Sequence, residues 1–361
     1  MKILKRYIIA EFIPPALMGL AVFTFILLMD KIVDLVDLVI NKGVDFISVC
    51  RLLIYSLPLL LSLSIPMAVL VGMLLSFGRL SQDKEITAMR SAGVSLYRII
   101  LAPITLALFV SLTLVFFNEN IAPIAQYKFR KFYFSLLYKN PIIKFEEHTF
   151  TDIGDYRIYV ENIDRKETRL RGVIIYKDLH TLITAQRGNK IIRGGKLYLH
   201  LEDGSIHEKN KKNPQEYNQL NFKEYEIGLD MYASKEDRNR MLNKNIREMN
   251  QSELKGEIDR LRAKGIPAYS IRVEYHLRRS LAFAAIAFSL VGIPLGIKAE
   301  QKGKTIGFGL SLGLIFIYYI LLVGGITFGE RGFFHPLLCV WIPNIFMAVL
   351  GAFFIYKAVN R

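Results

Sequence analysis

Long apolar runs alternate with short charged segments along most of the chain. A helix needs about 20 predominantly apolar residues to cross a bilayer. Six runs of roughly that length lack Asp, Glu, Lys and Arg: Phe12–Met29, Leu52–Gly78, Ile99–Asn118, Ser280–Ile297, Thr305–Gly329 and Phe333–Tyr356. Three precede and three follow a long polar insert, so the pattern predicts an α-helical polytopic membrane protein with six transmembrane helices and one inserted domain.

The first run resembles both a signal sequence and a membrane anchor. Lys2, Lys5 and Arg6 precede it, as basic residues precede the apolar part of a secretory signal. Pro14-Pro15 and the uninterrupted apolar stretch to Met29 make the run too long for a cleaved signal. We therefore expect it to be retained as the first span.

The insert, from about Glu119 to Arg279, has a β pattern. Short β-branched and aromatic segments are separated by polar turn residues: Tyr156–Val160, Gly172–Tyr176, Lys190–Arg193 and Lys196–Leu201. Asp203-Gly204 is a strong hairpin signal. Several short strands at this spacing favour a sandwich, a barrel or a jelly roll.

A helix is predicted between the β-rich segment and the fourth span. Leu254, Ile258 and Leu261 fall on one helical face, and Gly265 and Pro267 end the pattern.

Composition agrees with a membrane protein. The chain has 361 residues, is 52% hydrophobic and has a mean hydropathy of +0.30, which argues against an ordinary cytosolic enzyme. A net charge of +15 is compatible with nucleic-acid binding, but the apolar runs favour cytoplasmic loops as the place of much of that charge. Cys50 and Cys339 are too few for a disulfide framework or a Cys-rich zinc site.

The short loops predict the orientation, because Lys and Arg are retained on the cytoplasmic side. With the N-terminus inside, twelve short-loop cations are cytoplasmic: Lys2, Lys5, Arg6, Arg79, Lys84, Arg90, Arg98, Lys298, Lys302, Lys304, Lys357 and Arg361. Four lie on the opposite side: Lys31, Lys42, Arg51 and Arg331. We expect both termini to be cytoplasmic and the insert to be extracytoplasmic.

Catalytic motifs are scarce. Gly303-Lys304-Thr305 ends like a phosphate-binding loop, but the position five before Gly303 is Lys298 and no strand precedes it, so we interpret it as a charged loop. Glu146-Glu147-His148 does not match a metalloprotease pair. The six histidines are too scattered to nominate a metal site: His148, His180, His200, His207, His276 and His335.

The helical pattern of the first span continues outward beyond its apolar run. Asp30, Asp34, Asp37 and Asn41 recur at helical spacing through an otherwise apolar segment. Lys31 lies at the predicted membrane exit, where a charge commonly faces a bundle interior or a water-filled cavity. One interpretation is a lysine that reaches to lipid headgroups, and the other is a contact for an anionic ligand held between helices.

The loop after the second span predicts a short cytoplasmic helix. Ser81 can cap it, Asp83 and Glu85 favour its first turn, and Gly93 can end it. Ile86, Met89 and Ala92 then form an apolar stripe, which suits either an ordinary surface helix or docking into a groove of a partner.

The fifth span carries a weaker signal. Gly303/Gly307 and Gly309/Gly313 are two G-x-x-x-G spacings, and Gly324-Gly325 follow. Such spacings allow close packing of helices within the chain or against another subunit.

Taken together, these features resemble a known family. The order of three spans, a β-rich extracytoplasmic domain and three spans, together with the segment Arg79–Gly93, resembles the LptF/LptG family of lipopolysaccharide-export permeases. The resemblance covers essentially the whole chain, and Glu85–Met89 (Glu-Ile-Thr-Ala-Met) is its most specific part. Arg79–Gly93 and Asp30-Lys31 bring the sequence closer to the LptF branch.

The resemblance implies a permease subunit of an ATP-binding-cassette exporter in the Gram-negative inner membrane. Such a subunit pairs with a related, LptG-like permease, and an LptB-like ATPase dimer binds ATP and Mg²⁺, so no cofactor is expected on this chain. Lipopolysaccharide leaves the outer leaflet of the inner membrane for an LptC/LptA-like periplasmic bridge. The implied domains are 1–118 with a coupling helix at 81–93, a periplasmic jelly-roll-like domain at 119–268, and 269–361.

Site residues follow from this interpretation. We expect the lipopolysaccharide cavity to include Lys31, Asp34, Lys42, Arg51, Arg278 and Arg279. Arg278 and Arg279 are equally compatible with anchoring at the membrane surface. We expect the ATPase to be coupled through Asp83, Glu85, Ile86, Met89 and Arg90.

Two other classes of protein remain open at this stage. A polytopic enzyme acting on lipid-linked sugars needs paired carboxylates or a metal cluster, and Asp34/Asp37 is the closest outward-facing acidic pair in the membrane half. A mechanical permease that drives a periplasmic partner without moving substrate is distinguished by whether lipopolysaccharide crosslinks inside the bundle.

Overall fold

A computed structural model describes residues 2–40, 44–139, 147–153, 156–164, 169–177, 181–193, 196–209, 217–229, 243–298 and 304–359. Contacts divide the chain into two units. The helical unit comprises Met1–Leu35, Cys50–Phe129 and Asn245–Arg361, and the β unit comprises Val36–Val49 and Arg130–Lys244. Lys42, Gly303 and the Glu146 end of the Glu-Glu-His segment lie outside the described residues.

Long apolar helices form the helical unit, and six of the described helices are long and apolar enough to cross a membrane. The six predicted spans are confirmed as helices. Four of the apolar runs lie within a single longer helix, the run Ile99–Asn118 passes from α4 into η1, and the last run loses Phe333–His335 because α10 begins at Pro336. The helices are α1 (Lys2–Ile40), α2 (Phe46–Gln82), α3 (Glu85–Ser91), α4 (Leu96–Phe116), the π-helix η1 (Phe117–Ile121), α5 (Ala122–Lys139), the 3-10 helix η2 (Ile246–Glu248), α7 (Gln251–Ala263), α8 (Tyr269–Lys298), α9 (Lys304–Glu330) and α10 (Pro336–Val359).

Helix α8 is the centre of the helical unit, because it packs on α4, α9 and α10 and closely on α2. A Cβ added at Gly296 would lie 2.7 Å from the carbonyl oxygen of Leu74 in α2, so only glycine allows this approach. The Phe288 and Tyr318 rings, 4.7 Å apart in an edge-on arrangement, join α8 to α9.

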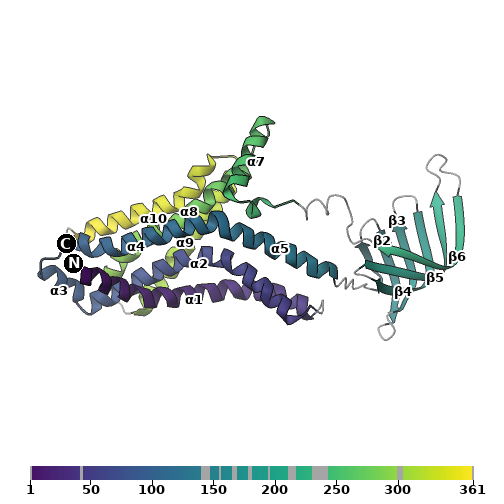
Figure 1. Ribbon diagram of the computed structural model, residues 1–361, viewed down its shortest axis with the longest axis horizontal. Coiled ribbons are helices and arrows are strands. Elements are labelled where there is room, and N and C mark those ends of the chain that lie inside the picture. Colours follow the sequence, from purple (N-terminus) through teal and green to yellow (C-terminus); the bar gives the residue numbers. More distant parts are fainter. Residues whose placement is uncertain are drawn as a thin grey trace. The chain divides into compact units, whose positions relative to one another are not determined.

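The helical unit has two ends (Figure 1). Helix α3, the first turn of α1 and the last turn of α10 lie at one end, named here the α3 end. Helix α7 and the start of α8 lie at the other, named the α7 end. The predicted helix before the fourth span is confirmed as α7, in which Leu254 is fully buried and Gly265 follows in a left-handed conformation.

The β unit contains one six-stranded antiparallel sheet, whose strands neighbour one another in chain order. They are β1 (Phe150–Ile153), β2 (Tyr156–Asp164), β3 (Arg169–Lys177), β4 (Thr181–Arg193), β5 (Lys196–Lys209) and β6 (Tyr217–Leu229). The inserted β domain is confirmed, and each of the four predicted segments lies within a strand. Its described strands form an up-and-down meander, a simpler order than the crossed strands of a jelly roll.

Alternating side chains build the core of the sheet. Ile158 and Val160 of β2 and Val173 and Ile175 of β3 point to the same buried face. Of the predicted interval 119–268, the β unit includes Arg130–Lys244, because the helical path of α4 continues through η1 into α5 and α7 packs on α8.

The predicted hairpin at Asp203-Gly204 is wrong. Both residues lie inside β5, which pairs with β4 on one side and with β6 on the other throughout this region. A Cβ at Gly204 would lie 2.3 Å from the carbonyl oxygen of Thr184, so glycine here serves close strand packing. Asp203 has a φ of 52°, a left-handed conformation that aspartate tolerates better than most residues, and the chain continues in β5 beyond it.

Candidate functional site

The α3 end contains the predicted short helix, with a later start than expected. Helix α2 continues to Gln82, and Lys84, with a φ of 56°, separates it from α3. Ser81 is therefore not the cap of α3; its hydroxyl donates to the carbonyl oxygen of Ile297 in α8 at 3.0 Å. Because α2 extends past Ser81, Leu80 is almost completely buried. Burial of this apolar side chain favours the longer α2 over a helix that starts at Ser81. Gly93 ends the helical segment as predicted, with a φ of 87°.

Two residues of the predicted apolar stripe, Ile86 and Met89, pack against the chain itself. Ile86 is 5% exposed in a cluster with Ile8, Phe77 and Leu96, and Met89 packs against that cluster. Burial in the chain's own core thus uses the apolar surface of Ile86, whereas Met89 is half-buried and Ala92 is exposed, and docking of this stripe into a partner's groove stays a prediction. The exposed residues of this segment are Asp83, Lys84, Thr87, Ala88 and Arg90–Gly93.

Polar side chains from three helices meet around α3. The Tyr7 hydroxyl in α1 donates to a Glu85 carboxylate oxygen at 2.7 Å. Arg79 in α2 forms ion pairs with Glu11 of α1 and, at 3.4 Å, with Asp83. Sequence reasoning missed Tyr7 and Glu11 because they are 68 or more positions from their partners.

Lys31 in α1 is paired with carboxylates from its own helix. Its ammonium lies 3.2 Å from an Asp34 oxygen and 3.4 Å from an Asp30 oxygen, and its side chain is 36% exposed. Two carboxylates outweigh one ammonium, so the cluster carries a net negative charge when all three groups are ionised. Asp34 of the predicted cavity is thus brought to Lys31, whereas Arg51 lies exposed near the start of α2.

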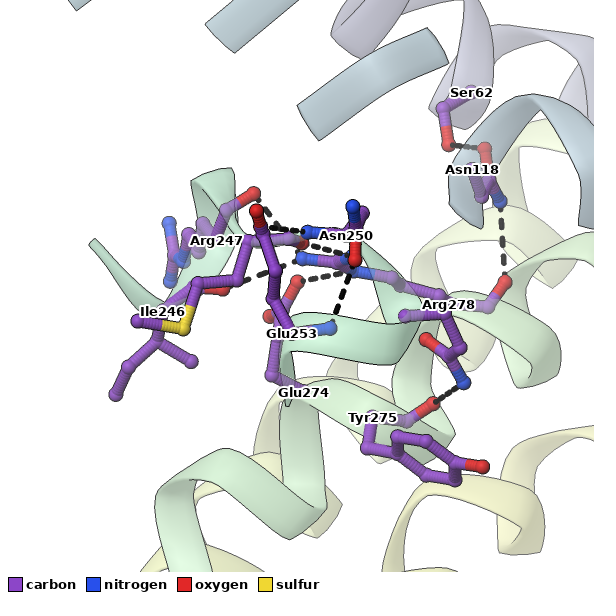
Figure 2. A network of polar contacts seen from close by, with 11 residues as sticks. Ser62, Asn118, Ile246, Arg247, Asn250, Glu253, Glu274, Tyr275 and Arg278 are labelled. Carbon is purple, nitrogen blue, oxygen red and sulfur yellow. Dashed lines mark hydrogen bonds and ion pairs between the residues drawn. The ribbon is translucent and has the colours of Figure 1, made fainter. Parts of the chain in front are cut away.

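Arg278 in α8 is the centre of a buried polar network at the α7 end (Figure 2). Its side chain is 6% exposed and donates to Glu274 at 3.0 Å. It also donates to the carbonyl oxygens of Met249 at 2.6 Å, Arg247 at 3.2 Å and Ile246 at 3.3 Å. These bonds use four of the five N–H donors of the guanidinium, so Arg278 holds the 246–249 segment on α8.

The same network crosses to two other helices through Asn118 (Figure 2). Asn118 lies in η1, is 3% exposed, accepts from the Ser62 hydroxyl of α2 at 2.6 Å and donates to the backbone carbonyl of Arg278 at 3.1 Å. A π-helical turn inside a long α-helix commonly marks a functional site or a local irregularity of packing. Here it positions an amide that joins α2 to α8.

Asn250 organises the next turn of the network. Its side chain caps α7 by accepting from the Glu253 backbone N–H at 2.8 Å, and the Glu253 carboxylate accepts from the Asn250 N–H at 2.8 Å. Such a reciprocal arrangement satisfies two backbone donors at a helix start. The Asn250 cap follows directly on the segment that Arg278 holds.

Arg279, the neighbour of Arg278, points to a different set of groups. It donates to Glu119 of η1 at 2.7 Å and lies over the Tyr275 ring, 5.3 Å from its centre. Its side chain is 42% exposed. Lys31, Arg278 and Arg279 of the predicted cavity thus each pair with carboxylates of their own: Asp30 and Asp34, Glu274, and Glu119.

A crevice of about 290 Å³ lies beside the Arg278 network. Its walls are mainly apolar side chains of α2, α8 and α9, including Leu59, Leu63, Leu277, Leu281 and Leu322, and its polar lining includes Ser62 and Asn118. Among the described residues, no group of three or more His, Cys, Asp and Glu side chains is arranged to hold a metal ion.

Comparison with known proteins matches the chain along nearly all its length. Residues 6–357 match the family model described as lipopolysaccharide export system permease LptF/LptG. The lipopolysaccharide export system permease protein LptF of Escherichia coli K12 is 20% identical over 370 residues, covering 97% of this chain and 93% of that protein. LptG of the same strain is 24% identical over 174 residues, covering 48% of each chain.

Proposed function

Because this chain belongs to the LptF/LptG family of lipopolysaccharide export permeases, we propose that it is the membrane subunit of an ATP-driven exporter. In this proposal it draws lipopolysaccharide from the outer leaflet of the inner membrane and passes it to a periplasmic bridge. The observation that carries the proposal is the family match over residues 6–357. The LptF relative supports the LptF-like branch, because its match covers 97% of this chain.

A separate ATPase dimer supplies the energy in this proposal, and ATP and Mg²⁺ bind there, with no cofactor held by this chain. The support for its docking place is the α3 end, where α3 projects between two spans and presents Asp83 and Arg90. Ile86 and Met89 contribute by fixing α3 to the helical unit. Glu85 lies between the exposed side and the core, where its carboxylate accepts from Tyr7.

A related permease completes the membrane part. The support comes from α9, where a Cβ at Gly309 or Gly313 would meet no atom of the other described residues within 4 Å, apart from the helix's own neighbouring backbone. Phe316 and Ile320, which follow in the same helix, are 68% and 54% exposed. Small residues beside exposed apolar ones suit close packing against another membrane helix. By contrast Gly325 packs within the chain, against Cys339 of α10.

The orientation proposed from the loop charges is retained: both termini and α3 are cytoplasmic, and the β unit is periplasmic. Lipopolysaccharide carries anionic groups, and Lys31, with Lys42 and Arg51 on the same side, is proposed to meet them. Pairing with Asp30 and Asp34 keeps Lys31 in place until an anionic group of the ligand replaces a carboxylate. Arg278 is better explained as a structural residue, because its buried side chain makes four hydrogen bonds within the chain.

The sheet offers an edge for the periplasmic bridge. Strand β6 ends the described sheet with 13 residues, and Leu220 and Tyr225 in it are 66% and 39% exposed. An unpaired edge of this kind can accept an added strand from a partner. We propose that a strand of a bridge protein pairs with β6 or with β1. The added strand would extend the apolar face of the sheet into the partner. A self-contained sheet that only separates the spans is the alternative.

The proposal is tested by isolating the chain from its native membrane together with its neighbours. We expect an ATPase and a related permease to co-elute, and a photocrosslinker at Lys31 to capture lipopolysaccharide. A matched crosslinker at Phe316, 68% exposed on α9, reports general lipid contact. Isolation of the chain without any ATPase would contradict the proposed function. Capture of lipopolysaccharide at neighbouring positions but never at position 31 would contradict the assignment of Lys31 to the cavity.

A further inference from the structure

Helix α1 packs against α3 through buried apolar side chains. Ile8 and Phe12 of α1 are 1% and 6% exposed and belong to the same buried cluster as Ile86 of α3. Leu4 of α1 and Met89 of α3 pack against that cluster as well. The first three turns of α1 therefore form part of the apolar surface against which α3 packs. This surface is named here the α3 seat.

Two sets of polar contacts between side chains, called ties below, add to this apolar packing. The Tyr7 hydroxyl donates directly to Glu85 of α3 at 2.7 Å. Glu11, one turn later on the same helix, pairs with Arg79, which also pairs with Asp83 in the turn before α3. Hydrogen bonds to a carboxylate are stronger than neutral ones, although solvent weakens them at an exposed site.

The covalent connections of α3 explain why these ties matter. Helix α3 is joined to α2 through Asp83 and Lys84, and Lys84 adopts a left-handed conformation that breaks the helix. It is joined to α4 through the segment around Gly93. No covalent link joins α3 to α1. A displacement of α3 therefore reaches α2 and α4 through the chain but reaches α1 through noncovalent contacts.

Helix α1 extends from this seat to the opposite side of the helical unit. It is continuous from Lys2 to Ile40, about 58 Å at 1.5 Å per residue. Lys31 and its carboxylate partners lie near the far end. Much of the surface of α1 is exposed, and its contact with α2 uses small residues, since a Cβ at Gly72 would lie 2.7 Å from that of Ala16.

From this geometry we propose that Tyr7 is a positioning residue that makes α1 move together with α3. Through the bond to Glu85, a displacement of α3 driven by the ATPase passes into α1 and along it to the Lys31 cluster. Glu11 and Arg79 form the second tie. This inference rests on the proposed function, because it takes α3 as the element that the ATPase moves.

The first experiment removes the hydrogen bond between Tyr7 and Glu85 by deleting one oxygen atom, the Tyr7 hydroxyl. The Tyr7→Phe variant is reconstituted with the ATPase and the related permease, and lipopolysaccharide released per ATP hydrolysed is measured. We expect this ratio to fall roughly fivefold, the factor that corresponds to one ordinary hydrogen bond, while ATP hydrolysis stays within about twofold of the unchanged protein. A purely structural role would lower assembly and leave the ratio of the assembled complex unchanged.

Tyr97→Phe is the matched control. Tyr97 lies at the start of α4, is 60% exposed, and has no hydrogen-bond partner among the described residues. It should release as much lipopolysaccharide per ATP as the unchanged protein. If Tyr7→Phe and Tyr97→Phe give the same ratio, the inference is wrong.

The second experiment measures whether the two helices move together. Spin labels are placed at Ile3 of α1 and Ala88 of α3, both exposed, after replacement of Cys50 and Cys339 by Ala. We expect the label distance to be the same in the nucleotide-free and the vanadate-trapped complex, and to broaden in Tyr7→Phe. A distance that changes between the two states of the unchanged protein would overturn the inference.

These outcomes differ from a failure of the proposed function. If the unchanged protein binds no ATPase, or if its complex releases no lipopolysaccharide with ATP, the proposed function is wrong. If release is normal while Tyr7→Phe behaves like Tyr97→Phe, only the Tyr7 inference fails.

Discussion

The two ends of the helical unit hold their polar side chains in different ways. At the α7 end, Arg278 is 6% exposed and has four acceptors, and Asn118 links three elements from a fully enclosed position. At the α3 end, Tyr7 is 41% exposed and makes one bond to Glu85.

The difference has a physical consequence. Removing one partner from a buried, hydrogen-bonded charge leaves the other uncompensated and costs several kcal/mol, whereas exposed ties exchange with water at little cost. The α7 end is therefore held by strong buried contacts, whereas the α3 end depends on apolar packing and on weaker exposed polar contacts that hold α1 and α3 together. The variants below test this difference.

Arg278→Gln should have the largest effect on stability. It leaves Glu274 and the 246–249 carbonyls without their donor, which costs about 3–5 kcal/mol for a buried pair. The measurement is thermal unfolding in detergent followed by the fluorescence of Trp341, the single tryptophan, which packs on Phe283 of α8. Arg279→Gln is the control, because its pair is partly exposed and should cost about 1 kcal/mol or less. Equal losses for the two variants would contradict the assignment of Arg278 as the anchor.

Asn118→Ala should come next. It leaves the Ser62 hydroxyl and the Arg278 carbonyl without their partner in a buried site, at a cost of about 1–3 kcal/mol. Asn120→Ala, two residues on in η1, removes an exposed bond to the Phe116 carbonyl and should change the midpoint much less. If both variants unfold at the temperature of the unchanged protein, Asn118 does not join α2 to α8 energetically.

Asn250→Ala should cost about 1 kcal/mol, the usual value for the loss of a helix cap. Asn250→Ser keeps a side-chain oxygen that accepts from the Glu253 N–H and should recover most of the loss. Hydrogen exchange of the first turn of α7 checks the local origin, since exchange there should accelerate in Asn250→Ala. Unchanged exchange in that turn would show that the cap is unimportant.

Lys31→Gln should have the smallest effect on stability, below about 1 kcal/mol, because exposed ion pairs contribute little. Its expected effect is on ligand contact: capture of lipopolysaccharide by a nearby crosslinker should weaken, and more so at low salt, where charge interactions are least screened. A large loss of stability, or capture that is indifferent to both salt and the substitution, would argue that Lys31 is a structural residue.

The sequence predicted the features that depend on local pattern. The six apolar runs and the alternation in Tyr156–Val160 and Gly172–Tyr176 are properties of neighbouring residues, and all appear as helices and strands. Local pattern failed at Asp203-Gly204, because the pairing of β5 on both sides outweighs the turn preference of two residues. Ser81 was misassigned for the same reason: burial of Leu80 extends α2 beyond it.

The candidate sites depend more on distant residues, and less of them was predictable. Glu85 was identified from its helix, but Tyr7 is 78 positions away and carries no motif. Arg278 was expected to face an anionic ligand. Its actual partners could not be predicted, because no sequence pattern shows that the carbonyls of residues 246, 247 and 249 converge on it. A charged residue near a membrane surface has several outcomes, and tertiary contacts decide among them.

The proposed coupling of ATP hydrolysis to lipopolysaccharide export through α3 is the step on which the proposed function depends. It is tested most directly by ATP-dependent release of lipopolysaccharide from proteoliposomes that hold the chain with its ATPase and its related permease. We expect release with the unchanged protein, and roughly tenfold less with Glu85→Lys, a change on the order of 1 kcal/mol or more at the helix start that also removes the hydrogen bond from Tyr7. Normal release by a fully assembled Glu85→Lys complex, or no ATP-dependent release by the unchanged one, would contradict it.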